Sequence, residues 1–278
     1  MLSETSNCYL CNSATPSKII VQWIDNETNE DYNIVECICG FNYLNPRPTE
    51  QTLSRYYSSE IYHPHSRGRG LIYYFFDLSR KFTFWWKLRI IRKLFKGSFN
   101  LLDYGSGDGA FVSYLIKKGI NAFGYDEYFI KDSPGKLKEN SYNIITLWHS
   151  LEHVHNLDKL FSTLDNFLES KGKIIFSVPN MNAPERKYFS DNWKAYDIPR
   201  HLYHFDSLSL ERLLKIKGYK IIKKKRMFLD TIYISILSKH DELSHIRLFY
   251  IIFVSLIKVI VKGPNFSSSL LYVCEKTN

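Results

Sequence analysis

A glycine-rich turn between two short apolar runs constrains the fold of this chain more than any other stretch. The first run, residues 99–104, is short, apolar and bounded by a turn, as in a buried parallel strand. A helix-period segment over 110–118 follows and ends at Gly119, and the second apolar run ends at Asp126. Three alternate glycines join the first run to the helix: Gly105, Gly107 and Gly109. This order predicts half of a nucleotide-binding α/β unit.

The glycines also predict where a ligand would bind. Glycine adopts positive φ and has no Cβ, so a ligand can approach the backbone closely. Asp126 lies 17 residues beyond Gly109 and is placed to accept hydrogen bonds from both hydroxyls of a ribose. The Gly-x-Gly-x-Gly spacing differs from that of dinucleotide sites, and Asp103 would repel a pyrophosphate but hold the ammonium of an amino-acid moiety. The alternative is a glycine-rich turn that binds nothing.

The turn resembles the first motif of class I S-adenosylmethionine-dependent methyltransferases. Other stretches over about residues 8–228 resemble a bacterial branch of that superfamily, which is encoded among glycan and secondary-metabolite genes and has a cysteine-rich N-terminus. They are Cys8-x-x-Cys11 and residues 37–48, 145–154, 177–180 and 193–205. The resemblance implies a Rossmann-like α/β fold with a seven-stranded sheet and helices on both faces. It also implies a methyl-donor site at the strand tips, with the acceptor site beneath N-terminal elements and elements that follow the fifth strand.

Carried over to this chain, the resemblance implies a specific set of cofactor-binding residues. They are Asp103, Tyr104, Gly105, Ser106, Gly107, Gly109, Asp126, Leu147, Trp148 and His149. One departure affects this site, because only 15 residues separate Asp126 from the next predicted strand. Members of the superfamily fit a helix, a strand and an adenine-contacting loop there. A short helix over 131–140 is expected instead, weakened by its Pro-Gly pair.

Three regions are expected along the chain. Residues 1–48 form a small zinc-ribbon-like lobe, 49–97 a basic, aromatic helical lid or linker, and 98–278 the Rossmann-like domain. Further strands are predicted at 141–148, 173–178, 219–227 and 269–274, and helices at 157–170 and 208–217, ended by Gly172 and Gly218. The apolar run 248–257 is too short to span a bilayer, which needs about 20 residues, and predicts a core or interfacial helix.

Four of the five cysteines predict a structural zinc site. Cys8 and Cys11 have the spacing of a zinc knuckle, in which a tight turn brings two thiolates to tetrahedral positions. The second pair, Cys37 and Cys39, is one residue closer than usual and is followed by a glycine. A site closed by four thiolates has no open position for chemistry. Free thiols are the alternative.

The positive charge gathers on one aromatic segment. The chain has a formal net charge of +9, and residues 67–96 hold nine Lys or Arg and a single acid, a net of +8. Such a segment can lie on an anionic membrane surface, bind a phosphorylated acceptor, or cover the site as a lid with its lysines in solvent. The lid is the favoured interpretation of the aromatic residues. The start of the chain is polar and carries no secretory pattern. A cytoplasmic location is therefore expected, and association with the inner membrane surface stays open.

Histidines occur where the reaction would need a base. A hydroxyl acceptor must lose its proton, and a positioned base contributes about 10²–10⁴-fold. His153 and His201 are the first candidates for that base and His149 the third; a structural role is the alternative for each. Substrate contacts are expected from Arg200, an anchor for an acidic acceptor, and from His204, Asn180 and His63. By resemblance to quinone-pathway O-methyltransferases, Glu152 and His153 are also candidate ligands of a divalent metal.

Together these features predict methyl transfer from S-adenosylmethionine, most simply to an oxygen of a saccharide or related small metabolite in surface-glycan biosynthesis. The acceptor class includes nucleotide-linked and lipid-linked sugars. Two alternatives stay open. The shortened segment after Asp126 suits a degenerate, non-catalytic binding partner in a biosynthetic complex. The calculated pI of 9.1 and the cysteines suit an RNA methyltransferase, although the base-methylation tetrad is absent from residues 147–150 and no nucleic-acid partner is expected.

Overall fold

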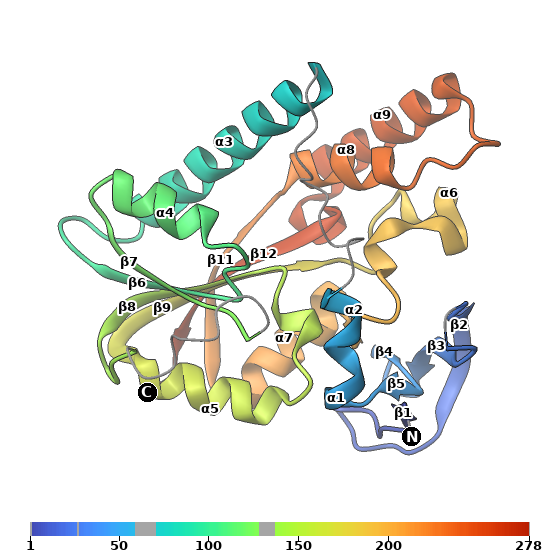
Figure 1. Cartoon of the computed structure of the whole chain (residues 1–278), viewed down its shortest axis with the longest axis horizontal. Coiled ribbons are helices and arrows are strands. Elements are labelled where there is room, and N and C mark those ends of the chain that lie inside the picture. The colour runs from blue at the N-terminus through green and yellow to red at the C-terminus, as the bar shows by residue number, and fades with distance from the viewer. Residues whose placement is uncertain (1, 27, 59–70, 128–136, 278) are drawn as a thin grey trace.

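A six-stranded, mostly parallel sheet forms the centre of the computed structural model, which describes residues 2–26, 28–58, 71–127 and 137–277 (Figure 1). Its order is β11-β12-β9-β8-β6-β7. The strands β6, β7, β8 and β9 run parallel, and β12 is antiparallel to both β9 and β11. Their bounds are β6 Asn100–Tyr104, β7 Asn121–Tyr125, β8 Tyr142–Trp148, β9 Leu168–Pro179, β11 Tyr219–Lys225 and β12 Ser269–Lys276.

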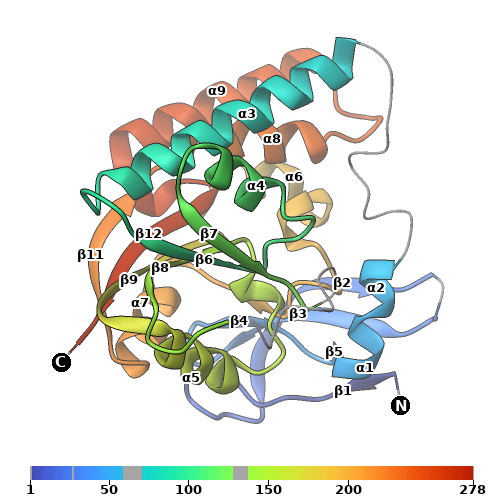
Figure 2. The same ribbon diagram turned by 60° about the vertical axis from the view of Figure 1, so that its left-hand side comes forward.

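Helices cover both faces of this sheet. The helices α3 (Leu71–Arg92), α4 (Ala110–Lys117), α8 (Phe228–Leu237) and α9 (His245–Lys262) lie on one side, and α5 (Leu157–Phe167) and α7 (Ser207–Ile216) on the other (Figures 1 and 2). Because both faces are covered, apolar side chains of the inner strands are fully buried on either side, as with Leu101 and Leu102 of β6. The predicted α/β fold with a parallel sheet is confirmed.

The prediction of seven strands is wrong for the residues that the structure describes. The sheet has six, and β7 forms its edge. The chain passes from β7 to β8 through residues 126–141, which is short for a crossover that also carries an additional strand and helix. The helix expected over 131–140 lies mostly outside the described residues.

One helix boundary also differs from its prediction. Helix α5 ends at Phe167 and β9 begins at Leu168, so Gly172 lies within the strand instead of ending the helix. A Cβ at Gly172 would come within 2.6 Å of the Leu168 side chain. Packing inside the strand therefore requires the glycine. The sequence pattern that predicts helix ends gives no information on such packing.

The N-terminal lobe is built on a second sheet with the order β10-β4-β3-β2. Its strands are β2 Pro16–Ile24, β3 Asp31–Cys37, β4 Asn42–Leu44 and β10 Tyr203–His204, and β1 Ser3–Glu4 pairs with β5 Arg47–Pro48. The short helices are α1 Glu50–Leu53, α2 Arg55–Ser58 and α6 Arg186–Phe189. Because β10 follows the central strand β9 in the chain, the lobe and the main domain share a sheet and one hydrophobic core.

No helix among the described residues is long and apolar enough to cross a membrane. The longest apolar stretch belongs to α9, where the sequence predicts a core or interfacial helix. One face of α9 is buried against the domain through Leu248, Ile251 and Val259.

Candidate functional site

The glycine turn follows β6 and is held against the end of β7. The amides of Gly105 and Ser106 both donate to the carbonyl of Tyr125, at 2.7 and 3.0 Å. Gly105 has φ +81°, and a Cβ there would lie 2.2 Å from the hydroxyl oxygen of Ser150, so this position requires glycine on two counts. At Gly107, with φ +56°, no described atom lies within 4 Å of an ideal Cβ. The backbone at Gly107 is therefore open to a ligand.

Asp126 closes this turn from the neighbouring strand. Its Oδ2 accepts a hydrogen bond of 2.7 Å from the amide of Gly107, and the residue is buried at the carboxyl end of β7. The two features singled out in the sequence, the turn and the second acid, thus touch each other directly.

A cavity of about 650 Å³ opens at the turn. It is of the size that holds a drug-sized ligand. Its lining includes Gly107, Asp126, Trp148, His149, His153 and His201, which brings the predicted cofactor residues and the predicted bases into one space. Tyr104 and Gly105 also line it.

Four of the predicted cofactor-binding residues do not line the cavity. Asp103 is buried, and its Oδ1 accepts a 2.5 Å hydrogen bond from the Thr146 hydroxyl. Burial raises the pKa of Asp103 to about 6, although the Lys87 ammonium opposes the rise. Leu147 is fully buried and Gly109 is the left-handed N-cap of α4. The Ser106 hydroxyl packs against Gly124. These residues shape the turn from behind.

His149 stands at the tip of β8 among acidic groups. Its Nδ1 lies 3.4 Å from Glu152 Oε1, and its Nε2 lies 3.3 Å from Asp230 Oδ2. Burial alone would lower its pKa, but Asp230 and Glu152 raise the pKa to about 9. An imidazole that holds two protons at neutral pH cannot accept another. In this geometry His149 is a cationic donor and not the base.

His201 has the opposite character. Its Nδ1 donates to the carbonyl of Ala195 at 3.0 Å, which leaves Nε2 as the acceptor. Nε2 lies 3.5 Å from Asp197 Oδ2 and 4.0 Å from Glu152 Oε1. Burial, together with the neighbouring His153, lowers the pKa of His201 well below its ordinary value. His201 is therefore neutral at pH 7, with its basic nitrogen beside two carboxylates.

His153 packs edge-on against His201, with 4.5 Å between ring centroids. Its Nδ1 lies 2.7 Å from the Tyr57 hydroxyl of α2 and 3.1 Å from the Arg200 carbonyl oxygen. A carbonyl only accepts, so a proton on Nδ1 satisfies it and leaves Nε2 as an acceptor. His153 and His201 thus both present an acceptor nitrogen and both line the cavity.

Glu152 lies at the centre of these imidazoles. It is fully buried, and among the described residues neither of its carboxylate oxygens has a hydrogen-bond partner, although His149 forms an ion pair with it. Ligand atoms of Glu152, His153 and His201 lie within 4.8 Å of one another. The three side chains have the donor types and spacing to hold a divalent ion.

The predicted substrate residues are placed less favourably. The Arg200 side chain pairs with Asp197, with Nη2 2.5 Å from Oδ1, and does not line the cavity. His204 is buried away from the cavity, and burial lowers its pKa to about 3. Asn180 is fully buried and donates to the carbonyls of Asn265 and Ser267. None of the three residues lines the cavity, and the substrate contacts expected from them stay predictions. His63 lies outside the described residues.

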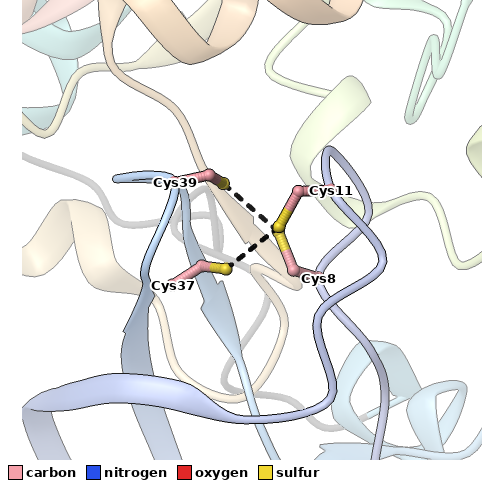
Figure 3. Close-up of side chains that lie close together, drawn as sticks. All are labelled: Cys8, Cys11, Cys37 and Cys39. Carbon is pink, nitrogen blue, oxygen red and sulfur yellow. Dashed lines mark hydrogen bonds between the residues drawn. The ribbon is translucent and has the colours of Figure 1, made fainter.

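The four predicted cysteine ligands converge in the N-terminal lobe (Figure 3). Cys8 Sγ lies 3.6 Å from Cys39 Sγ, Cys11 Sγ lies 3.3 Å from Cys37 Sγ, and all four sulfurs lie within 4.8 Å of one another. Tetrahedral zinc with 2.3 Å bonds to sulfur sets ligand separations of about 3.8 Å. The cluster fits a zinc ion, and the short spacing of the second pair does not prevent the convergence.

Three residues at or near the cavity could not be predicted from the local sequence motifs. Helix α8 contributes Asp230, which contacts His149, and Tyr233, which lines the cavity. Lys87 of α3 places its ammonium 4.3 Å from the ring centroid of Trp148, and burial lowers its pKa to about 8. An apolar, helix-period run at 228–237 indicates a helix, but only the tertiary structure shows that this helix borders the site.

The comparison with known families decides the identity. A family model described as a methyltransferase domain matches residues 74–224, more than half of the chain. The chain belongs to this methyltransferase family. The prediction of a methyltransferase is thereby confirmed at the level of the family. No curated protein matches the sequence.

Several solved structures are similar to this methyltransferase. Geranyl diphosphate C-methyltransferase from Streptomyces coelicolor A3(2) is 14% identical, with a TM-score of 0.50, over 82% of this chain and 98% of that one. Phosphoethanolamine N-methyltransferase 2 from Haemonchus contortus is 17% identical, with a TM-score of 0.46, over 69% of this chain; the match spans about half of that longer chain, 52%. A SAM-dependent methyltransferase from Archaeoglobus fulgidus is 19% identical, with a TM-score of 0.45, and the match covers 73% of this chain and 99% of that one. At 14% identity, the likeness to the first of these structures shows the fold alone.

Proposed function

We propose that this methyltransferase moves the methyl group of S-adenosylmethionine to a hydroxyl of a saccharide or related small metabolite in glycan biosynthesis. One observation carries the proposal. A single cavity is lined both by the open glycine turn with Asp126 and by a neutral, buried histidine, His201. Donor and acceptor would meet inside it.

The donor end fits an adenosyl sulfonium compound. Gly107 leaves the backbone accessible, and Asp126 presents a buried carboxylate at the strand tip, where ribose hydroxyls can donate to it. Trp148 forms an apolar wall beside the turn. When bound, S-adenosylmethionine supplies an already activated methyl group. The protein then has to hold the two reactants in line and exclude water.

His201 supplies a base that is neutral before the reaction, with two carboxylates beside the nitrogen that would accept the proton. His201 accepts a hydroxyl proton at Nε2, because its Nδ1–H is held by the Ala195 carbonyl. The resulting imidazolium lies beside Asp197 and Glu152. Both carboxylates then stabilise a charge that develops only as the reaction proceeds, which lowers the barrier.

The lining favours a polar, hydroxyl-rich acceptor. Asp197, Asn156 and Lys159 line the cavity together with Glu50 of α1. Such groups pair with sugar hydroxyls through hydrogen bonds. We place the four cysteines outside the chemistry, as ligands of a structural zinc ion that holds the N-terminal lobe.

A labelled-methyl transfer assay against a panel of sugar nucleotides tests the function. Transfer by the wild type and none by Gly107→Arg, whose side chain would fill the donor end, is the expected result. Calorimetry separates the alternatives. If the wild type does not bind S-adenosylmethionine at millimolar concentration, the chain is a non-catalytic binding partner. Transfer to RNA together with a steep loss of RNA affinity as salt rises would show an RNA methyltransferase instead.

A further inference from the structure

Helix α9 exposes a continuous apolar face among the described residues. Seven large apolar residues, each between 43% and 84% exposed, recur at three- and four-residue spacing along the whole helix. They are Ile246, Phe249, Tyr250, Phe253, Ile257, Ile260 and Val261. Residues at this spacing lie on one stripe of a helix. The opposite stripe packs into the domain through Leu248, Ile251 and Val259, so α9 is apolar on two sides.

The neighbouring helix exposes further apolar residues. Helix α8 packs against α9 and exposes Phe228, Leu229, Tyr233, Ile236 and Leu237. Exposed apolar residues scattered singly over a surface are ordinary, but a large contiguous set marks an interaction site. We call these twelve residues of α8 and α9 the apolar face.

Charge indicates what covers the apolar face. Helix α9 contains no Asp or Glu, whereas Arg247, Lys258 and Lys262 belong to it. Arg247 and Lys258 are eleven residues apart and so lie on the same flank of the stripe. At the far end, Nη2 of Arg226 lies 3.5 Å from the Ile260 carbonyl. The two exposed acids of this region, Asp241 and Glu242, lie in the loop before the helix.

Further exposed aromatic and basic residues lie on the same side of the sheet. Helix α3 lies there with α8 and α9 (Figures 1 and 2). It exposes Phe82 and Trp85, and the Arg89 guanidinium lies 5.4 Å from the Trp85 ring centroid. Apolar and aromatic residues bordered by Lys and Arg are typical of helices that lie in the plane of an anionic membrane.

We propose that the apolar face docks on an anionic lipid surface, with α9 in the plane of the membrane. The apolar stripe enters the headgroup region, and the basic flank meets the lipid phosphates. A second copy of the chain fits less well, because an antiparallel two-fold interface through α9 would set the basic flanks of the two copies against each other. Tyr233 belongs to the apolar face and also lines the cavity, so docking would bring the cavity close to the lipid surface. The inference does not depend on which acceptor is methylated.

Vesicle flotation tests the docking. Wild-type protein should float with phosphatidylcholine vesicles that contain phosphatidylglycerol, and weakly with phosphatidylcholine alone. The double variant Phe249→Glu/Phe253→Glu should lose about tenfold or more of this binding, because two exposed rings no longer enter the lipid. Leu208→Glu is the matched control, since Leu208 is 70% exposed on α7, on the opposite side of the sheet. Its binding should equal that of the wild type.

Charge reversal and sedimentation complete the test. Arg247→Glu/Lys262→Glu should remove the preference for phosphatidylglycerol. Three results would overturn the proposal: no flotation of the wild type with anionic vesicles, equal flotation of the wild type and the Phe249/Phe253 double variant, or a wild-type dimer that this variant converts to a monomer without any vesicle binding. Binding of S-adenosylmethionine by every variant shows that the site is intact, which separates a failure of docking from a failure of the proposed chemistry.

Discussion

The amide of Gly107 donates to the carboxylate of Asp126 at 2.7 Å, across the ends of two adjacent parallel strands. The hydrogen bond ties the turn after β6 to the end of β7. It orients the carboxylate towards the open backbone of the turn. The position of Asp126 at the donor end of the cavity therefore depends on the same residue that keeps this end clear of side chains.

Replacing Asp126 with Ala should weaken binding of S-adenosylmethionine about 10–100-fold, since hydrogen bonds to a charged group contribute about 1.5–3 kcal/mol. Isothermal titration calorimetry measures the change. Asp126→Asn retains one acceptor oxygen and should lie between the wild type and the Ala variant. Equal dissociation constants for all three proteins would show that Asp126 does not contact the ligand.

Two neighbouring glycines should respond differently to Ala. Gly107→Ala meets no described atom and should cost about 1–2 kcal/mol of unfolding free energy, the cost of a left-handed backbone for a residue with a side chain. Gly105→Ala adds a clash with Ser150 and should cost about 1–3 kcal/mol more. Denaturant unfolding compares the two. Adding Ser150→Gly removes the hydroxyl and Cβ that a new methyl group would meet, so it should recover part of the loss; no recovery would place the strain elsewhere.

The donor end of the site follows from the sequence because it is local. The glycines, Asp126 and the strands around them lie within 28 residues of one another, and their spacing alone specifies strand, turn, helix and strand. The cysteine cluster is predictable for a similar reason, since the two-residue gap between Cys8 and Cys11 is typical of a knuckle and a second close pair follows at Cys37 and Cys39. Short-range chemistry therefore accounts for the donor end and for the cysteine cluster.

The acceptor end does not follow from the sequence, because it depends on long-range packing. Asp230 raises the pKa of His149 from a helix 81 residues further along the chain. Asn180 and His204 are polar residues in matching motifs, yet both are buried by contacts that no local pattern encodes. A motif shows which residue types are present, while their protonation and exposure come from neighbours supplied by the tertiary structure.

The raised pKa of His149 predicts a pH-dependent contribution to stability. Its pKa is about 9 in the folded chain against 6.5 in the unfolded chain, so the folded state binds the additional proton more tightly. The stabilisation is complete below pH 6.5 and is lost as pH rises through 9. His149→Asn removes it while tolerating the positive φ of 54°. The difference in unfolding free energy between wild type and variant should therefore shrink between pH 6.5 and 9; a constant difference would contradict the pairing with Asp230 and Glu152.

Purified protein should contain one zinc ion per chain, measured by elemental analysis. Cys11→Ser should lose the metal and lower the unfolding temperature, because the lobe depends on four thiolates for its closure. Cys274→Ala is the matched control, since Cys274 is buried in β12 away from the cluster. It should retain the metal. A strong chelator should destabilise the wild type and leave Cys11→Ser unaffected, and a metal-free wild type of equal stability would show that the cysteines are free thiols.

His201→Gln should lower the rate of methyl transfer about 10²–10⁴-fold and leave the affinity for S-adenosylmethionine unchanged, because the side chain lies at the acceptor end and acts on a proton. Because burial and His153 lower the pKa of His201, the rate should fall only at pH values well below 6.5. His240→Gln, in the loop before α9, serves as a control and should show full activity. If His201→Gln is active and His153→Gln is not, the base is His153; if both variants keep the full rate, proton removal by this histidine pair is excluded.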